Sequence, residues 1–472
     1  MIHKRIFQIN AILIIILGSL ITFLNRNFLL DDALIYYRYI LNFIDGNGLV
    51  YNIGERFNAL TSPVYVHISI LFSLITREVE TTQLVINCIA IISSGILLSV
   101  IFYQLKKDLL AFFSSMIFIT SRYFYTTFGL ETNMFIFFSL FCIFLYLKNK
   151  LYLLSLFSAL LILTRGEGIF LVIILWSLIL YRNGTRYKLK YFLIIASVLL
   201  LNLGFNYFYY GSFLPHTLTA KIDQGSSGLW GVKYSFLLDF NFLYHIAFNN
   251  QAFFILFLLV LSLIGFVNHW REEFSLILLL YCLLITVFHL AFNIQSYHWY
   301  YAIHFLTFTV FIGYGVNDTV SYISQKYKSV LLRTCLIIVI FIYPALTQVE
   351  LFRLLSHEGP NQNYKIIGEW INRNTPENCK VACLEIGHIG WFSKRYIVDL
   401  VGLINPSISD ALSKHDYEKW YGTYKPDYLV VHDPVAGVEL TIQKFIDSKT
   451  YIEEPGFSLK GFKILKLNSF RE

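Results

Sequence analysis

The feature that most constrains this chain is a series of apolar runs separated by short basic turns. A backbone inside a lipid bilayer must satisfy its own hydrogen bonds, so a run that crosses it forms a helix. A crossing helix needs roughly 20 mainly apolar residues, and shorter runs are tolerated inside a bundle. The pattern predicts about eleven helices, at residues 6–24, 83–104, 109–122, 130–147, 151–164, 168–181, 190–210, 251–267, 273–292, 299–317 and 330–346.

Composition excludes a soluble enzyme of several domains. Only 14% of the 472 residues are charged and 56% are hydrophobic, whereas soluble domains carry about 25% charged residues. The charge is also uneven, because residues 1–349 have a formal net charge of +8 and residues 350–472 one of −1. The basic excess therefore belongs to membrane turns and does not indicate nucleic-acid binding. We expect a membrane domain over residues 1–346 and a soluble domain over residues 347–472.

The basic residues predict how the helices are oriented. The chain begins MIHKR, and its first apolar run is not followed by a small-residue cleavage site, so we expect a retained first helix with a cytoplasmic amino end. Lysines and arginines then collect in alternate short turns, as the positive-inside rule requires. The longer segments, 25–82 and 211–250, and the soluble domain fall on the outer side of the cytoplasmic membrane. We therefore expect the function to reside on that outer face.

The soluble domain is predicted to be a small α/β fold. The segments CKVACLEI, RYIVDLVGL and DYLVVHD have the apolar character of strands, and YKIIGEWINRN and VELTIQKFID have helical spacing. The motif GHIG at residues 387–390 is expected to be a turn. No phosphate-binding glycine loop appears in this part of the chain.

Two adjacent acids directly after the first helix are the candidate catalytic residues. Asp31 and Asp32 open an amphipathic stretch in which Arg38 is expected to face water. Either acid can simply cap an interfacial helix. Alternatively, one carboxylate caps while its partly desolvated neighbour has a raised pKa and serves as a general base. The sequence does not decide which of the two is the base.

A transfer reaction with a phosphate leaving group also needs cations near the base, because they stabilise the departing charge. Arg38, Arg165 and Lys221 are predicted at or near the outer face and are the candidates for binding a donor phosphate. Each can equally extend to lipid phosphates or pair with an acid.

Two further acids lie beside apolar runs, where an unpaired charge is costly. Glu131 occurs in FGLETN and Glu167 in LTRGEG, and both are candidates for substrate binding. The alternative is an ion pair with Arg165. The two aspartates together with Glu131 have ligand atoms suited to a divalent ion, but no metal spacing requires one, and the use of a metal stays open.

The remaining candidates for substrate contact are aromatic or imidazole side chains on the predicted outer face: Tyr37, His216 and His298. Tyrosine suits the face of a sugar or a prenyl chain. For His298, which precedes Trp299, the alternative is membership of the aromatic belt at the membrane surface.

The segment DDALIYYRYILNFIDGNGLVYNIGERFNALTSP resembles the first extracytoplasmic loop of GT-C membrane glycosyltransferases, in the group that includes the mycobacterial terminal β-(1→2)-arabinofuranosyltransferases. Similar motifs follow in the same order: GLET at residues 129–132, TRGEG at 164–168, YYGSFLPHTLTAK at 209–221 and EIGHIGWFSKRYIVDLVGL at 385–403. Gly166 replaces a proline of the family pattern and His216 replaces an asparagine.

The resemblance implies an α-helical polytopic membrane bundle of the GT-C type with a C-terminal extracytoplasmic α/β domain. It further implies an inverting transferase that moves a sugar from a polyprenyl-phosphate donor to a glycan or lipid acceptor outside the membrane. Asp31 or Asp32 would be its base. The two departures leave the identity of the sugar open. Its partners would be the donor, the acceptor and membrane lipids.

Two other classes of protein are alternatives to the transferase. A transporter or flippase for lipid-linked saccharides tends to show two related halves with broken helices at matching positions, and no such repeat is legible. A glycan-binding or assembly protein would need only an anchor and no buried acids. Convergence of Asp31, Glu131, Arg165 and Lys221 on one outward cavity would favour the transferase over both.

Overall fold

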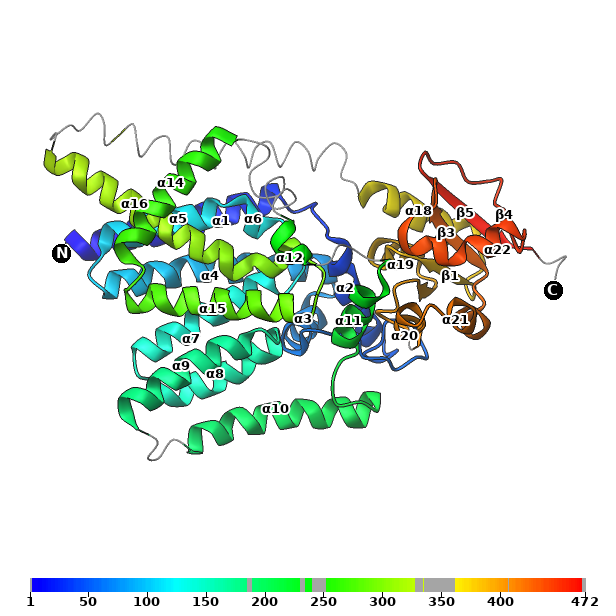
Figure 1. The fold of residues 1–472 in the computed structure, drawn as a ribbon, viewed down its shortest axis with the longest axis horizontal. Coiled ribbons are helices and arrows are strands. Elements are labelled where there is room, and N and C mark those ends of the chain that lie inside the picture. The colour runs from blue at the N-terminus through cyan, green and yellow to red at the C-terminus, as the bar shows by residue number, and fades with distance from the viewer. Residues whose placement is uncertain are drawn as a thin grey trace.

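The computed structural model describes residues 2–184, 189–229, 234–239, 252–326, 334, 361–405 and 407–468. Helices fill the part up to residue 326, and a small sheet with short helices follows from residue 361 (Figure 1). Most helices run along one direction, and the sheet lies at one end of them, opposite the end that holds the N-terminus (Figure 1).

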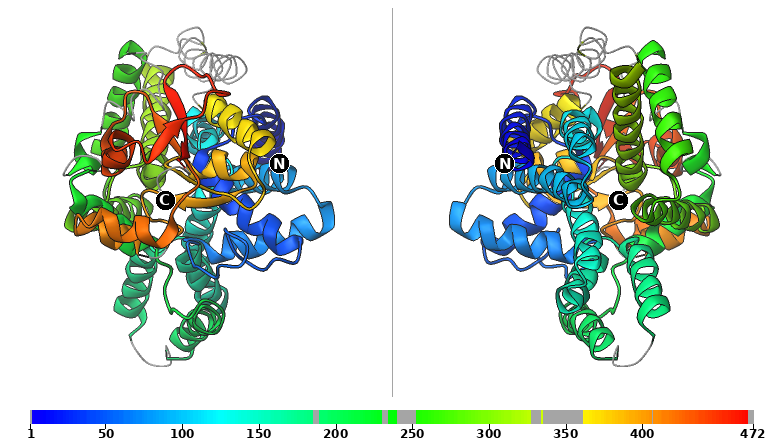
Figure 2. Two further views of the ribbon diagram at one scale, coloured as in Figure 1. Left: turned by 90° about the vertical axis from the view of Figure 1, so that its right-hand side faces the viewer. Right: turned by 90° about the vertical axis from the view of Figure 1, so that its left-hand side faces the viewer.

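The helical part follows the order of the apolar runs. Its elements are α1 (Ile2–Leu24), α2 (Asp31–Ile44), α3 (Pro63–Thr76), α4 (Val79–Gln104), α5 (Asp108–Thr120), α6 (Arg122–Tyr125), α7 (Thr132–Leu147), α8 (Leu151–Thr164), α9 (Gly168–Asn183), α10 (Leu189–Tyr210), α11 (Thr217–Ser227), α12 (Ser235–Leu238), α14 (Ala252–His269), α15 (Glu273–Ala291), the 3-10 helix η1 (His298–Tyr301) and α16 (Ala302–Lys326). Figure 2 shows the bundle end-on from both sides.

Four of the described helices are long and apolar enough to cross a membrane: Arg5–Leu24, Val79–Gln104, Leu189–Tyr210 and Glu273–Ala291. The other apolar helices are shorter. Each predicted helix from 6–24 to 299–317 overlaps one of the helices of the structure. The predicted helix at 330–346, and with it the boundary between residues 346 and 347, lies outside the described residues. Helix α3 was not predicted and falls within the predicted outer segment 25–82.

The C-terminal part is a five-stranded mixed sheet in the order β2-β1-β3-β5-β4. Strand β1 pairs in parallel with β2 and β3, whereas β5 pairs antiparallel with β3 and β4. The elements are α18 (Asn361–Asn374), β1 (Lys380–Cys383), α19 (Ile386–Ser393), β2 (Tyr396–Asp399), α20 (Ile408–Ser413), α21 (Tyr417–Tyr424), β3 (Tyr428–His432), the 3-10 helix η2 (Gly437–Ile442), α22 (Gln443–Asp447), β4 (Tyr451–Glu453) and β5 (Phe462–Leu467).

Two local expectations were wrong, and one contact explains both. Residues 387–390, predicted to be a turn, lie inside helix α19. Arg38, predicted to face water, is buried with 9% of its surface exposed. Helix α19 of the C-terminal domain packs against α2 of the helical part, so each element shields the other from solvent. Nothing local in the sequence signals this pairing, because the two helices are separated by more than 340 residues.

Candidate functional site

A cavity of about 500 Å³ lies where several helices end near the C-terminal domain. One part of its wall is polar and is lined by Asp32, Tyr36, Thr61, Glu131, Arg165, Glu167, Lys221 and His289. Apolar residues line much of the rest, among them Ile162, Leu163, Leu199, Leu203, Leu214 and Phe288. The cavity therefore joins a cluster of charges to a surface suited to a hydrocarbon chain.

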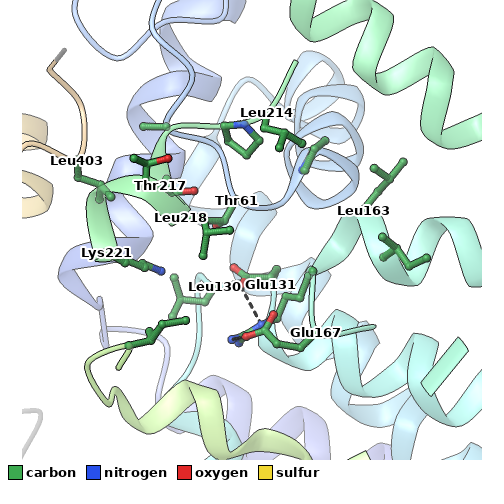
Figure 3. A pocket seen from close by; sticks show the side chains of 18 of the residues that line it. Thr61, Leu130, Glu131, Leu163, Glu167, Leu214, Thr217, Leu218, Lys221 and Leu403 are labelled. Carbon is green, nitrogen blue, oxygen red and sulfur yellow. Dashed lines mark hydrogen bonds and ion pairs between the residues drawn. The ribbon is translucent and has the colours of Figure 1, made fainter. Parts of the chain in front are cut away.

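The polar residues come from different elements, and several of them lie at helix ends or in the connections between helices. Asp32 lies in the first turn of α2, Glu131 directly precedes α7, and Lys221 lies in α11. Arg165 and Glu167 occupy the short connection between α8 and α9. Helix ends meet at the same level in a bundle, so charges excluded from the apolar spans gather there. Figure 3 shows Glu131, Glu167 and Lys221 around one space, with Leu163 at one side and Leu403 at the other.

Asp32 is a carboxylate of the cavity whose pKa is raised. Its removal from bulk water raises the pKa of Asp32 to about 7, and the negative charge of Asp31 adds to this effect. The positive charge of Lys221 acts in the opposite direction and lowers the pKa. A carboxylate with a pKa near the working pH can accept a proton in one step and release it in another.

Arg165 is held by two acids. Its Nη2 lies 2.9 Å from Oε1 of Glu167, and its Nε lies 3.7 Å from Oε1 of Glu131. A further N–H of Arg165 donates to the carbonyl oxygen of Trp299 at 3.1 Å. Both glutamates therefore form the ion pairs with Arg165 that were the alternative to substrate binding. They orient its guanidinium in the wall of the cavity.

Lys221 reaches the cavity from α11 and donates a hydrogen bond to the hydroxyl of Tyr300. Its ammonium also lies 5.1 Å from the centre of the Tyr300 ring. Because no ion pair is formed by Lys221 among the described residues, its charge is less neutralised by protein groups than that of Arg165. Lys221 is the better placed of the two for an anionic ligand.

The structure does not bring all predicted residues to the cavity. Asp31 points away from it: its carboxylate accepts hydrogen bonds from the backbone N–H groups of Gly387 and His388, at 3.0 and 2.7 Å. Arg38 also lies on that side and donates to the carbonyl oxygens of Tyr51 and Gly390 at 2.9 and 2.8 Å. Neither residue lines the cavity.

Three more predicted residues lie outside the cavity lining. Tyr37 packs edge-on against Trp391, and His216 lies with Nε2 3.1 Å from the hydroxyl of Ser409. His298 lies with Nε2 3.0 Å from the carbonyl oxygen of Thr126. These contacts hold loops and domains together near the cavity.

Sequence reasoning missed much of the cavity lining, including His289 and Leu403. His289 lies in α15, and its position in the apolar run LITVFHLAF is the signal that could have identified it, since an ionisable residue in such a run is costly. Leu403 comes from the loop after β2, whose backbone N–H groups donate to the buried Asp399 carboxylate. No local pattern marks an isolated leucine as part of a cavity.

The described residues contain no group of three or more His, Cys, Asp or Glu side chains arranged to hold a metal ion. Asp31 and Asp32 point to different sides of α2. The predicted set of both aspartates with Glu131 is therefore not assembled around one point.

Known proteins resemble this chain in fold and in part of its sequence. A family model described as a domain of unknown function (DUF8728) matches residues 355–463. No curated protein matches the chain in sequence.

Several solved structures match most of the chain. ArnT from Cupriavidus metallidurans, bound to undecaprenyl phosphate, superimposes with a TM-score of 0.62 over 97% of this chain and 98% of its own, at 10% identity. The oligosaccharyltransferase of Archaeoglobus fulgidus in its apo form gives 0.58 over 91% of this chain and 69% of its own, at 13% identity. The oligosaccharyltransferase AglB of that organism, in complex with an inhibitory peptide and a dolichol-phosphate, gives 0.54 over 98% and 74%, at 13% identity. The chain therefore shares its fold with ArnT and AglB, which agrees with the GT-C architecture expected from the sequence.

Proposed function

We propose that the protein is a membrane glycosyltransferase that moves a sugar from a polyprenyl-phosphate donor to the hydroxyl of a glycan or lipid acceptor. We place the cavity on the outer side of the cytoplasmic membrane and assign residues 347–472 to an extracytoplasmic domain. The observation that carries the proposal is the cavity itself. One space contains Asp32, with its raised pKa, next to two cations, and continues along an apolar wall.

The apolar wall suits the prenyl chain, and the cations suit the phosphate. Lys221 is the principal phosphate contact, and Arg165, whose charge is shared with Glu131 and Glu167, is the second. Arg38 is not assigned to the phosphate site, because its N–H groups donate to backbone carbonyl oxygens outside the cavity. The polyprenyl phosphates bound to ArnT and AglB support a donor of this class.

Transfer then proceeds as a single displacement. The oxygen of the acceptor hydroxyl bonds to the anomeric carbon of the sugar while Asp32 takes its proton. The bond between that carbon and the phosphate oxygen breaks, and the polyprenyl phosphate leaves with the electron pair. Lys221 and Arg165 stabilise the charge that develops on it. Attack opposite the leaving group inverts the configuration at the anomeric carbon.

Convergence of charges on one cavity also bears on the alternative of a flippase. Asp32, Glu131, Arg165 and Lys221 line a single space, as a reaction centre requires. Asp31 does not join them. This arrangement supports transfer over transport.

The test compares Asp32→Asn with Asp45→Asn, a change of the exposed aspartate that follows α2 in the same segment. Full-length protein in lipid nanodiscs is given radiolabelled undecaprenyl-phosphate arabinose, glucose, mannose, galactose or N-acetylglucosamine, with a lipid and glycan extract of the source cells as acceptor. We expect Asp32→Asn to lower kcat by about 10²–10⁴-fold and Asp45→Asn to leave it unchanged. Wild-type turnover by Asp32→Asn would contradict the assigned base.

A further inference from the structure

The contact between α2 and α19 includes hydrogen bonds in addition to apolar packing. The carboxylate of Asp31 accepts the backbone N–H groups of Gly387 and His388 in the first turn of α19. His388 Nδ1 also lies 2.9 Å from Oδ1 of the same carboxylate. The first N–H groups of a helix have no partner inside that helix. Asp31 therefore caps a helix of the other domain.

Two glycines make this approach possible. A Cβ atom at Gly387 would lie 1.8 Å from the backbone oxygen of Asp31, and one at Gly390 would lie 1.9 Å from the hydroxyl of Tyr51. Any side chain larger than hydrogen would separate the two helices. The glycines of the GHIG motif thus serve close packing against the outer segment that contains the acids.

Two carbonyl oxygens of α19 are held as well. Arg38 donates to the carbonyl oxygen of Gly390 at 2.8 Å. The hydroxyl of Tyr51 donates to the carbonyl oxygen of Ile386 at 2.6 Å. Arg38 and Asp31 are seven residues apart, two turns of one helix, and so lie on one face of α2. That face of α2 is fixed to α19 along two turns.

The first turn of α2 is packed within the helical part, but the residue that precedes it does not cap it. The residue before its first turn is Leu30, which cannot accept a hydrogen bond through its side chain, and no side-chain cap is formed there. Asp31 and Asp32 both lie in that turn. A contact that fixes Asp31 therefore also fixes the direction in which Asp32 points.

We propose that α19 of the C-terminal domain positions the base: His388 and the first N–H groups of α19 hold Asp31, and thereby keep Asp32 turned into the cavity. The inference rests on the proposed function, because it assigns the base to Asp32. Asp31 and His388 are positioning residues and need not touch substrate. The C-terminal domain is thus a part of the catalytic centre.

Asp31 has an electrostatic effect in addition to its position. The charged groups that act on Asp32 are Asp31, Lys221, Glu131 and Asp399. Asp31 raises the pKa of Asp32, so Asp31→Asn lowers it. Since the ionised form of Asp32 is the active base, the rise of kcat/KM with pH moves to lower pH in this variant.

The positioning test uses two changes at His388 and a matched histidine elsewhere. His388→Leu removes the donor to Asp31, whereas His388→Asn places an amide N–H near the position of Nδ1. His432→Leu is the control, because His432 Nδ1 contacts Glu439 at the same 2.9 Å but within the C-terminal domain. Transfer from the active undecaprenyl-phosphate sugar and binding of undecaprenyl phosphate are both measured.

We expect His388→Leu to lower kcat by about 10–100-fold, because a displacement of about 1 Å at a reacting group has an effect of this size. The KM for the donor and the affinity for undecaprenyl phosphate stay within about twofold, since Lys221 and Arg165 are unchanged. His388→Asn restores most of the rate, and His432→Leu keeps it.

The outcomes separate this inference from the proposed function. A normal kcat in His388→Leu overturns the positioning role, even if Asp32→Asn is inactive. An active Asp32→Asn overturns the proposed base itself. If His388→Leu does not fold, the kcat of Asp31→Asn still decides: a loss of tenfold or more with unchanged affinity for undecaprenyl phosphate supports the inference, and a wild-type kcat overturns it.

Discussion

The two faces of α2 differ in what they contact, although they are made by the same short sequence. Asp32, Ile35 and Tyr36, at the spacing of one helical turn, line the cavity. Asp31 and Arg38, two turns apart, are bound to backbone groups of the C-terminal domain. Adjacent residues on a helix differ by about 100° in direction, so a pair of aspartates can divide two tasks. A motif that looks like one site is divided between the cavity wall and the contact with the C-terminal part.

Among changes on the cavity side of α2, the largest effect is expected for Arg165→Leu, and it is a loss of stability. The change leaves Glu131 buried without its cation and takes from the partly buried Glu167 its nearest one, and loss of one partner from a buried ion pair costs about 3–5 kcal/mol of stability. Thermal or denaturant unfolding in nanodiscs measures it.

The control for that change is Arg182→Leu, because Arg182 pairs with Glu273 at 2.9 Å in an exposed position. Exposed ion pairs contribute about 0–1 kcal/mol. Equal stability of the two variants would show that the acids beside the cavity do not depend on Arg165.

A smaller effect is expected for Lys221→Met, which alters the cavity face alone. Loss of a charged hydrogen bond of about 1.5–3 kcal/mol should weaken binding of undecaprenyl phosphate by about 10–100-fold. Because Lys221 lowers the pKa of Asp32, its removal raises that pKa, and the rise of kcat/KM with pH moves to higher pH. Titration calorimetry and a pH–rate profile measure the two effects.

The direction of this shift is opposite to the one expected for Asp31→Asn, so the two variants form a pair. Unchanged affinity in Lys221→Met would remove Lys221 from the phosphate site. A shift in the same direction for both variants would contradict the assignment of Asp32 as the group that titrates.

The smallest effect is expected for Gly390→Ala, which disturbs the docking face alone. The new methyl group would meet Tyr51 and the guanidinium of Arg38, at 1.9 and 2.8 Å, and forces α19 away from α2. We expect kcat to fall about tenfold, a tenth of the loss that a 1 Å displacement can cause, with affinity for undecaprenyl phosphate unchanged. Gly422→Ala in α21, where a methyl group meets nothing within 4 Å, should behave as wild type. Full activity in both would show that the close approach of the helices is not needed.

The sequence predicts the helical part well, because apolar runs separated by basic turns allow few other arrangements. Charges beside such runs are costly and stand out, and five residues singled out in this way line the cavity: Asp32, Glu131, Arg165, Glu167 and Lys221. The sequence does not show which face of α2 each aspartate occupies. That is decided by α19, which lies more than 340 residues further along the chain.

The motif GHIG illustrates the same limit. Two glycines in four residues disfavour a helix by about 1 kcal/mol each, and a turn is the reasonable local prediction. The structure forms a helix there because α2 packs closely against it. Arg38 was placed in water for the complementary reason: the helix that covers it was expected to be a turn.

Helix α10 gives the cavity an unusual kind of wall. It packs mainly against α8 and runs along the edge of the bundle, with 11% of its most apolar stretch buried (Figure 1). Its Leu199 and Leu203 nevertheless line the cavity. In a bilayer, acyl chains cover the opposite side of this helix and press on the same wall. The surrounding lipid therefore supports one wall of the cavity, and we expect replacement of lipid by detergent to change the volume of the cavity.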